Sequence, residues 1–104
     1  MIRACAVADL PEGEALRLGG PAPIAVFHTE DGFYAIDDTC THQDASLADG
    51  YLEDCSVECP LHASTYDLRT GKPSGPPATD PVAVYAVQVD GDDVLVDVTT
   101  AVND

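Results

Sequence analysis

The sequence predicts a single all-β domain, and three observations support this prediction. Short apolar runs rich in β-branched residues recur along the chain, as they do in strands. Two pairs of these runs flank an Asp-Gly turn, which is typical of a β-hairpin. No segment carries a convincing helical apolar period. A chain of 104 residues is the size of one domain, so residues 1–104 are expected to fold as one unit.

Turn residues separate the first four expected strands. Pro11-Glu12-Gly13 and Gly19-Gly20-Pro21 interrupt the apolar pattern, and Glu30-Asp31-Gly32 joins two apolar runs into a hairpin. The strands expected in this part of the chain are residues 2–7, 15–18, 24–28 and 33–36.

The end of the chain repeats the hairpin pattern, with strands expected at residues 82–89 and 94–98 around a turn at residues 90–93. The middle of the chain, residues 38–80, differs because it contains three of the four cysteines and two of the three histidines. We interpret this middle segment as a loop-rich insert on a β scaffold.

The chain is strongly acidic, with 19 Asp and Glu against 4 Lys and Arg and a formal net charge of −15 at pH 7. Phosphate contacts need a basic face, so neither a nucleic acid nor an anionic membrane is an expected partner, whereas a basic protein is. No apolar stretch approaches the roughly 18 residues of a membrane span, and no signal-peptide pattern is found. We therefore expect the cytoplasm, where cysteines stay reduced and serve as free thiols or metal ligands.

The chemistry-bearing pattern is Cys40-Thr41-His42, followed after 16 residues by Cys59-Pro60-Leu61-His62. Each half offers one thiolate and one imidazole within a tight turn, and three metal centres compete for this donor set. A Cys2His2 zinc site is disfavoured because finger-type sites usually place like ligands on each knuckle. An all-cysteine ferredoxin site would need Cys5 and Cys55, whose spacing does not match. In a Rieske [2Fe–2S] centre two histidines replace two cysteines on one iron, which both halves could supply.

The pattern extends downstream of the second motif. The chain continues with Ala63-Ser64-Thr65-Tyr66-Asp67, then Thr70-Gly71-Lys72-Pro73, and then Gly75-Pro76-Pro77. Together with the flanking strands, these motifs resemble the Rieske-type ferredoxins of multicomponent aromatic-ring-hydroxylating dioxygenases over essentially the whole chain.

The resemblance implies a Rieske fold, in which an antiparallel β-sandwich scaffold carries a smaller loop-rich cluster-binding subdomain, here about residues 38–80. It implies one Rieske-type [2Fe–2S] cluster, with Cys40 and Cys59 on the inner iron and His42 and His62 on the outer iron near solvent. It further implies that the loop at Gly75, Pro76 and Pro77 covers the cluster.

The resemblance also implies a function. The chain would be a monomeric, soluble one-electron carrier and not an enzyme. It would accept electrons from an NAD(P)H-dependent flavin reductase and pass them to a terminal oxygenase, itself a Rieske non-haem iron enzyme. His42, Gln43, Leu61 and His62 would form the docking tip. Three alternatives stay open: the small Rieske-fold subunit of an NADH-dependent nitrite reductase, a ferredoxin serving a cytochrome P450 or other monooxygenase, and a zinc-binding interaction module.

Four positions bear on the reduction potential expected from the resemblance. High-potential Rieske proteins carry a disulfide at the positions that correspond to Ala45 and Leu61, so that bridge cannot form here and a low potential is favoured. Ser64 and Tyr66 match positions that donate hydrogen bonds to the cluster or a ligand sulfur, which would raise the potential. Ala63 stands where the family commonly has glycine.

Other residues carry simpler expectations. Cys5 is expected to be a small buried residue of the first strand, and Cys55 a free surface thiol. His28 is expected at the surface or at a sheet edge. The aromatic residues expected in the core are Phe27, Phe33, Tyr34, Tyr51 and Tyr85.

The segment between the two ligand motifs, residues 43–58, contains five acidic residues and no basic ones. They serve either as a solubilising surface or to steer the protein toward a basic face on its redox partners. These acids are Asp44, Asp49, Glu53, Asp54 and Glu58.

Overall fold

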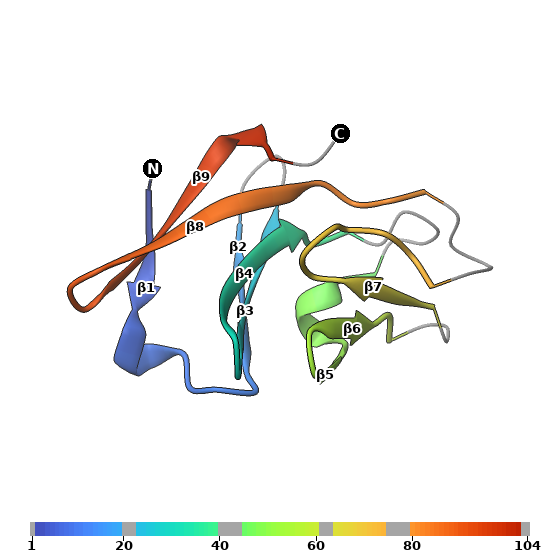
Figure 1. The fold of residues 1–104 in the computed structure, drawn as a ribbon, viewed down its shortest axis with the longest axis horizontal. Coiled ribbons are helices and arrows are strands. Elements are labelled where there is room, and N and C mark those ends of the chain that lie inside the picture. Colours follow the sequence, from blue (N-terminus) through green and yellow to red (C-terminus); the bar gives the residue numbers. More distant parts are fainter. Residues whose placement is uncertain (1, 20–22, 40–44, 61–63, 75–79, 103–104) are drawn as a thin grey trace.

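The computed structural model describes residues 2–19, 23–39, 45–60, 64–74 and 80–102, whose strands form two antiparallel sheets (Figure 1). The strands of the large sheet are β1 (Ile2–Ala6), β2 (Ala15–Leu18), β3 (Ile24–Thr29), β4 (Gly32–Asp37), β8 (Val84–Asp90) and β9 (Asp93–Ala101). The strands of the small sheet are β5 (Tyr51–Glu53), β6 (Ser56–Glu58) and β7 (Thr65–Asp67).

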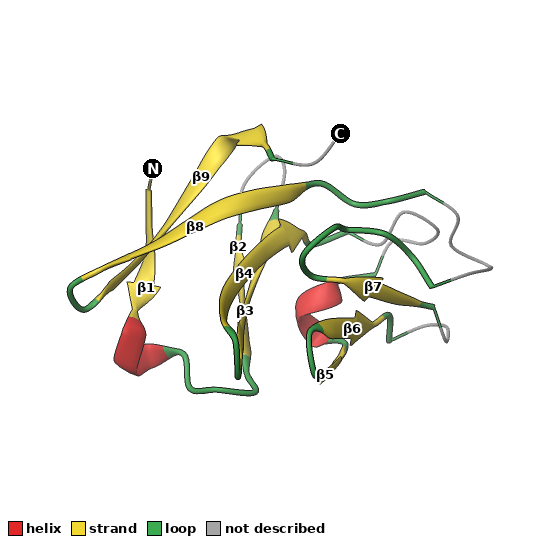
Figure 2. Cartoon of the chain, viewed as in Figure 1, coloured by secondary structure: helices red, strands yellow, loops and turns green. Residues whose placement is uncertain are grey.

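The strand order is β1-β9-β8-β4-β3-β2 in the large sheet and β5-β6-β7 in the small one. Helical structure in the described part of the chain is limited to two short 3-10 turns, η1 (Val7–Asp9) and η2 (Leu47–Asp49) (Figure 2). The predicted all-β class is therefore confirmed.

All six predicted strands are present, and the largest differences lie in the C-terminal hairpin. There β8 begins at Val84, and β9 continues to Ala101. The middle segment was expected to be loop-rich, and it contains the three strands of the small sheet. Each of these strands has only three residues, so apolar alternation is too brief to reveal them from the sequence.

Strand β3 is buried on both faces and separates two apolar clusters. Ile24 and Val26 point into one cluster, which also receives side chains from β1, β4 and β9. Ala25 and Phe27 point to the opposite side, into a second cluster shared with the small sheet. The large sheet thus packs on itself to form the predicted sandwich, and its other side supports the small sheet.

Two predictions about individual residues are wrong because sheet position overrides local sequence. Cys55, expected at the surface, is only 7% exposed, because its carbonyl accepts a 2.9 Å hydrogen bond from the Leu68 amide and the turn folds inward. His28 lies on an interior strand and is half-buried, with its ring stacked on Phe33 at 4.0 Å and Nδ1 2.7 Å from the Leu10 carbonyl oxygen. The prediction that Cys5 is buried is confirmed.

The aromatic residues divide into three groups. Phe27 is fully buried as predicted, and Tyr51 is exposed, which contradicts the prediction. Phe33, Tyr34 and Tyr85 are partly buried and pack against the two clusters.

The side chain of Asp38, at the end of β4, is only 1% exposed and joins four parts of the fold. Its Oδ1 atom accepts hydrogen bonds from Ser46 Oγ at 2.7 Å and from the Ala48 amide at 3.0 Å. Its Oδ2 atom lies 3.0 Å from Arg17 Nε on β2. The Asp38 backbone adds a bond from its amide to the Pro23 carbonyl at 3.0 Å. Asp38 therefore fixes the segment that precedes the small sheet to the large sheet.

The neighbouring Asp37 holds a different segment. Its Oδ2 atom accepts a 3.0 Å hydrogen bond from the Ala83 amide, and its Oδ1 atom accepts one of 2.7 Å from the Tyr85 hydroxyl. Its own amide donates to the Ala83 carbonyl at 2.9 Å. The two adjacent carboxylates thus anchor the chain on both sides of the middle segment.

Replacing Asp38 with Ala is expected to lower the free energy of unfolding by roughly 2–4 kcal/mol, because buried donors lose a charged acceptor. Chemical unfolding measures this, and iron content reports whether the middle segment still assembles. Asp93→Ala, which removes the exposed ion pair with Arg3, is the control and should change little. Equal stability of the two variants would contradict this role of Asp38.

The Tyr85 hydroxyl predicts a pH dependence. Burial first, and then its bond to Asp37, raises the pKa of Tyr85 to about 12. The folded state therefore keeps this proton after the unfolded chain has lost it at about pH 10. This contribution to stability is fully present below about pH 10 and is lost as the pH rises toward 12. Urea unfolding across this range should show a smaller decline for Tyr85→Phe than for the unmodified protein, and parallel curves would refute the assignment.

Candidate iron–sulfur cluster site

Of the four predicted ligands, the structure describes Cys59. Its side chain is 1% exposed and lies directly after β6. Three ligands and several neighbours predicted to act at the site lie outside the described residues. They are Cys40, His42, Gln43, Leu61, His62, Ala63, Gly75, Pro76 and Pro77. Their predicted roles therefore stay predictions.

The second motif is enclosed by the β6–β7 hairpin. Glu58 pairs with Thr65, and one step further the Cys59 amide donates a 3.0 Å hydrogen bond to the Ser64 carbonyl. Only residues 60–63 remain between these closing residues. The covalent chain therefore keeps the Cys59 thiol and the sequence position of His62 within one short loop.

The base of the first motif is closed in a similar way. Thr39 and Ser46 form an isolated antiparallel bridge on either side of residues 40–45. The Asp38 carboxylate holds Ser46 as well, and the Asp38 carbonyl accepts a 2.6 Å bond from the Leu47 amide. The two ends of this segment are thereby fixed to β4.

The described flanks of the two motifs share one apolar cluster. Ala45 and Leu47 follow the first motif, and Cys59 and Tyr66 belong to the second, and all four are buried in the same group of side chains. The fold therefore brings the flanks of both motifs to one end of the molecule, where the small sheet lies against the large one (Figure 1).

Hydrogen bonds also fix the described residues on both sides of the proline-rich segment. The Ser74 amide donates to the Thr65 carbonyl at 2.8 Å, and the Val82 amide donates to the Gly71 carbonyl at 2.9 Å. Tyr66 forms a bridge with Pro73. The described residues on both sides of this segment are therefore held beside β7, and the predicted role of the segment itself lies outside the described residues.

Ser64 and Tyr66, predicted to donate hydrogen bonds to the cluster or a sulfur, are both buried. Tyr66 has no exposed surface, and Cys59 belongs to its apolar cluster. Buried hydroxyls form hydrogen bonds, and the predicted role of these two as donors to the cluster stays a prediction.

The donor set fits a [2Fe–2S] cluster. With two thiolates and two neutral imidazoles, the oxidised cluster carries no net charge, whereas an isolated thiolate in this apolar surrounding would be strongly destabilised. The buried position of Cys59 is therefore compatible with a neutral group held beside it.

The other two described cysteines do not belong to this site. Cys55 and Cys59 lie at opposite ends of β6, and Cys5 belongs to the cluster on the other side of β3. Burial raises the pKa of the Cys5 and Cys55 thiols, which favours their protonated forms. Within the described ranges, no group of three or more His, Cys, Asp or Glu side chains could hold a metal ion.

Sequence reasoning missed the part of Asp37 and Asp38 in building the site. Their only signal in the sequence is a pair of acids at the end of a predicted strand, which also fits a surface turn.

No helix in the described part of the chain is long and apolar enough to span a membrane.

Comparison with known proteins gives consistent results. The Rieske [2Fe-2S] domain family matches residues 1–86. The 3-phenylpropionate/cinnamic acid dioxygenase ferredoxin subunit of Escherichia coli (strain K12) is 52% identical over 101 residues, which cover 96% of this chain and 95% of the relative.

Two solved structures show the same fold. One chain in the complex of reduced oxygenase and oxidized ferredoxin in carbazole 1,9a-dioxygenase superposes with a TM-score of 0.86 and 40% identity, covering 91% of this chain and 90% of that chain. A chain assigned as an NADH-dependent nitrite reductase small subunit from Mycobacterium tuberculosis gives a TM-score of 0.81 over 91% of each chain, but at 22% identity it shows the fold alone.

The ligand motifs, the two-sheet architecture and these matches agree over most of the chain. The chain belongs to the Rieske [2Fe–2S] domain family, and its cofactor is one Rieske-type [2Fe–2S] cluster.

Proposed function

We propose that this chain is the ferredoxin of a multicomponent aromatic-ring dioxygenase. It takes one electron at a time from an NAD(P)H-dependent flavin reductase and passes it to a terminal Rieske non-haem iron oxygenase. The observation that carries this proposal is the Cys-x-His and Cys-x-x-His pair in a chain 52% identical to a dioxygenase ferredoxin subunit over 96% of its length.

One hollow among the described residues has a lining that does not suit an aromatic substrate. This hollow has a volume of about 580 Å³ and is lined by Glu12, Gly13, Thr29, Glu30, Leu52 and Asp54. An aromatic substrate would need a predominantly apolar pocket, and this hollow is lined by three carboxylates. The bound cluster would supply the redox chemistry by taking up and releasing one electron.

The residues of the chain have three tasks in this function: they hold the cluster, they limit its rearrangement and they form the docking tip. Cys40, His42, Cys59 and His62 hold the cluster, and the hairpin closure at Cys59 limits its rearrangement. Small structural changes between redox states favour fast electron transfer. His42, Gln43, Leu61 and His62 form the tip that meets both partners, so reductase and oxygenase bind in turn to a monomeric carrier.

The location that fits this function is the cytoplasm. Reducing conditions keep thiols free, and none of the three described cysteines forms a disulfide with another described residue. We also expect a low reduction potential. Ala45 and Leu61 stand where high-potential Rieske proteins have the two cysteines of a disulfide, so that disulfide cannot form here.

Metal analysis and EPR of the purified chain test the proposal. We expect two irons and two acid-labile sulfides per chain, and after dithionite reduction a rhombic EPR signal with the low average g value of a Cys2His2 centre. The reduced protein should then reduce a terminal oxygenase. A colourless protein with stoichiometric zinc would support the interaction-module alternative, and tight copurification with a nitrite reductase would support that subunit instead.

The two buried hydroxyls predict a shift in potential. Ser64→Ala and Tyr66→Phe should each lower the midpoint potential by up to about 60 mV, because one hydrogen bond of roughly 1.4 kcal/mol to the reduced state is lost. Protein-film voltammetry measures this shift. Ser56→Ala, a change on the outer face of the small sheet, is the control. Unchanged potentials in both variants would exclude these hydroxyls as donors to the sulfurs.

A further inference from the structure

The outer face of the small sheet has an unusual composition. Strand alternation directs Leu52, Val57 and Tyr66 inward, where they are partly or fully buried. The register then places two rows of three residues on the other face. These rows are Tyr51, Glu58 and Thr65, and Glu53, Ser56 and Asp67.

Tyr51 is the most exposed large apolar residue described in the structure, at 67%. Tyr51 is paired with Glu58 across the β5–β6 hairpin. A large aromatic side chain gains little from such exposure, and tyrosine is enriched where proteins bind one another. The exposed ring therefore indicates a contact made with a partner.

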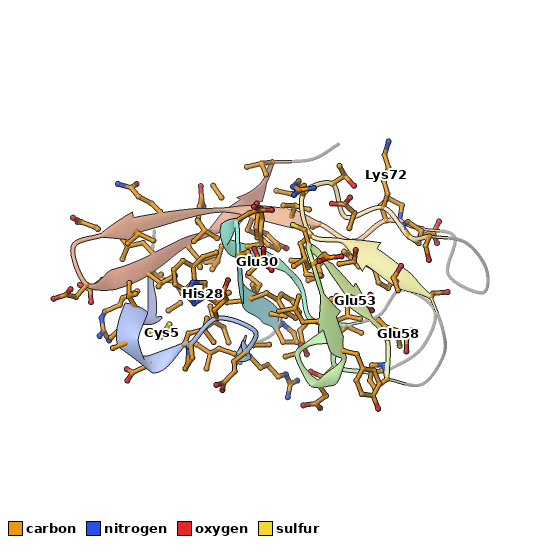
Figure 3. The ribbon with its side chains drawn as sticks, turned by 60° about the horizontal axis from the view of Figure 1, so that its bottom comes forward. Cys5, His28, Glu30, Glu53, Glu58 and Lys72 are labelled. Carbon is orange, nitrogen blue, oxygen red and sulfur yellow. The ribbon has the colours of Figure 1, made fainter. Side chains whose placement is uncertain are left out.

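The residues around Tyr51 are acidic and lack basic counterparts. Among the described residues, the ion pairs are Arg3–Asp93, Arg17–Asp38 and Arg69–Asp31. Glu53 and Glu58 take part in none of them, and both project from the small sheet (Figure 3). Their charge is thus available to a cationic group from outside.

The same face has a hollow of about 260 Å³ lined by Tyr51, Glu53, Asp54, Ser56, Glu58 and Thr65. A guanidinium or ammonium group entering it would meet carboxylates from Glu53 and Glu58 and the face of an aromatic ring. Charge-assisted hydrogen bonds and a cation–π contact both favour arginine or lysine in such a place.

The face is continuous with the cluster site along the chain. Glu58 directly precedes the buried ligand Cys59, and Thr65 directly follows Ser64, which closes the ligand loop. A protein seated on Tyr51 and Glu58 therefore lies next to Cys59, as the redox partner of a cluster held by Cys59 must.

We propose that the outer face of β5 and β6, with Tyr51 at its centre and Glu53 and Glu58 beside it, is the docking surface for a basic patch of the terminal oxygenase. The inference rests on the proposed function. The oxygenase is assigned because a ferredoxin that is 40% identical to this chain forms a complex with its oxygenase. An arginine or lysine of the oxygenase occupies the hollow, and the acids speed the encounter.

The test uses the holo-protein and the oxygenase of the E. coli 3-phenylpropionate/cinnamic acid dioxygenase. Stopped-flow mixing of reduced ferredoxin with oxidised oxygenase gives the second-order rate constant at several salt concentrations. Glu53→Gln/Glu58→Gln should lower this constant about tenfold at low salt and flatten its salt dependence. Tyr51→Ala should weaken binding while leaving the salt dependence largely intact, because it removes no charge.

The matched control is Asp90→Asn/Asp92→Asn, which changes the net charge equally. These residues lie at the β8–β9 turn, at the opposite end of the molecule from the small sheet (Figure 1). This control should keep the rate constant and its salt dependence. EPR spectra and midpoint potentials confirm that every variant retains its cluster, and the Glu→Gln pair still decides the question if Tyr51→Ala does not fold.

The outcomes separate the two proposals. If the unmodified ferredoxin does not reduce the oxygenase, the proposed function fails. If it does, and the Glu53→Gln/Glu58→Gln variant is as fast with the same salt dependence, the docking surface is wrong. A loss confined to electron uptake from a flavin reductase would overturn the assignment to the oxygenase.

Discussion

The buried carboxylate of Asp38 is the interaction on which the site depends most. A carboxylate is stable away from water only when its oxygens accept several hydrogen bonds or meet a cation, and Asp38 has both. Its partners come from β2, from the end of the first ligand segment and from η2. One side chain therefore fixes where the first motif leaves the large sheet and where the small sheet begins.

This constraint explains how a small β domain can hold two loops together. The second motif needs little help, because a two-stranded hairpin closes it from both sides. Among the described residues, no strand pair flanks the first motif in this way, since β4 of the large sheet ends at Asp37 before it and β5 of the small sheet begins at Tyr51 after it. Asp38 and the bridge between Thr39 and Ser46 replace the missing strand pairing there.

The acidic residues of the chain divide into two kinds by this account. Asp37 and Asp38 are internal acceptors that hold segments of the fold, so their charge is used within the molecule. Glu53 and Glu58 face outward on a sheet whose inner side is apolar, so their charge is available to a partner. The net charge of −15 therefore combines structural carboxylates with a surface that suits a basic protein.

The fold class followed from the sequence because strand patterns are local, and the cofactor followed from the resemblance to Rieske-type ferredoxins that the ligand motifs carry. The order Cys-x-His and Cys-x-x-His restricts the donor set, and runs of β-branched residues between turn residues give strands. Six of the nine strands in the described part of the chain could be located in this way. The three-residue strands of the small sheet are too short to show an alternating apolar pattern.

Burial and charge pairing, in contrast, were decided only by tertiary structure. Cys55 and Tyr51 both belong to the small β5–β6 hairpin, yet one is enclosed and the other exposed, because Cys55 packs in the apolar cluster shared with the large sheet and Tyr51 lies on the outer face. Asp38 and Glu58 look alike in the sequence, and only the packing of distant strands makes one an internal anchor and the other a surface charge. Local sequence sets the chemistry that is available, and contacts between residues far apart in the chain decide where that chemistry is placed.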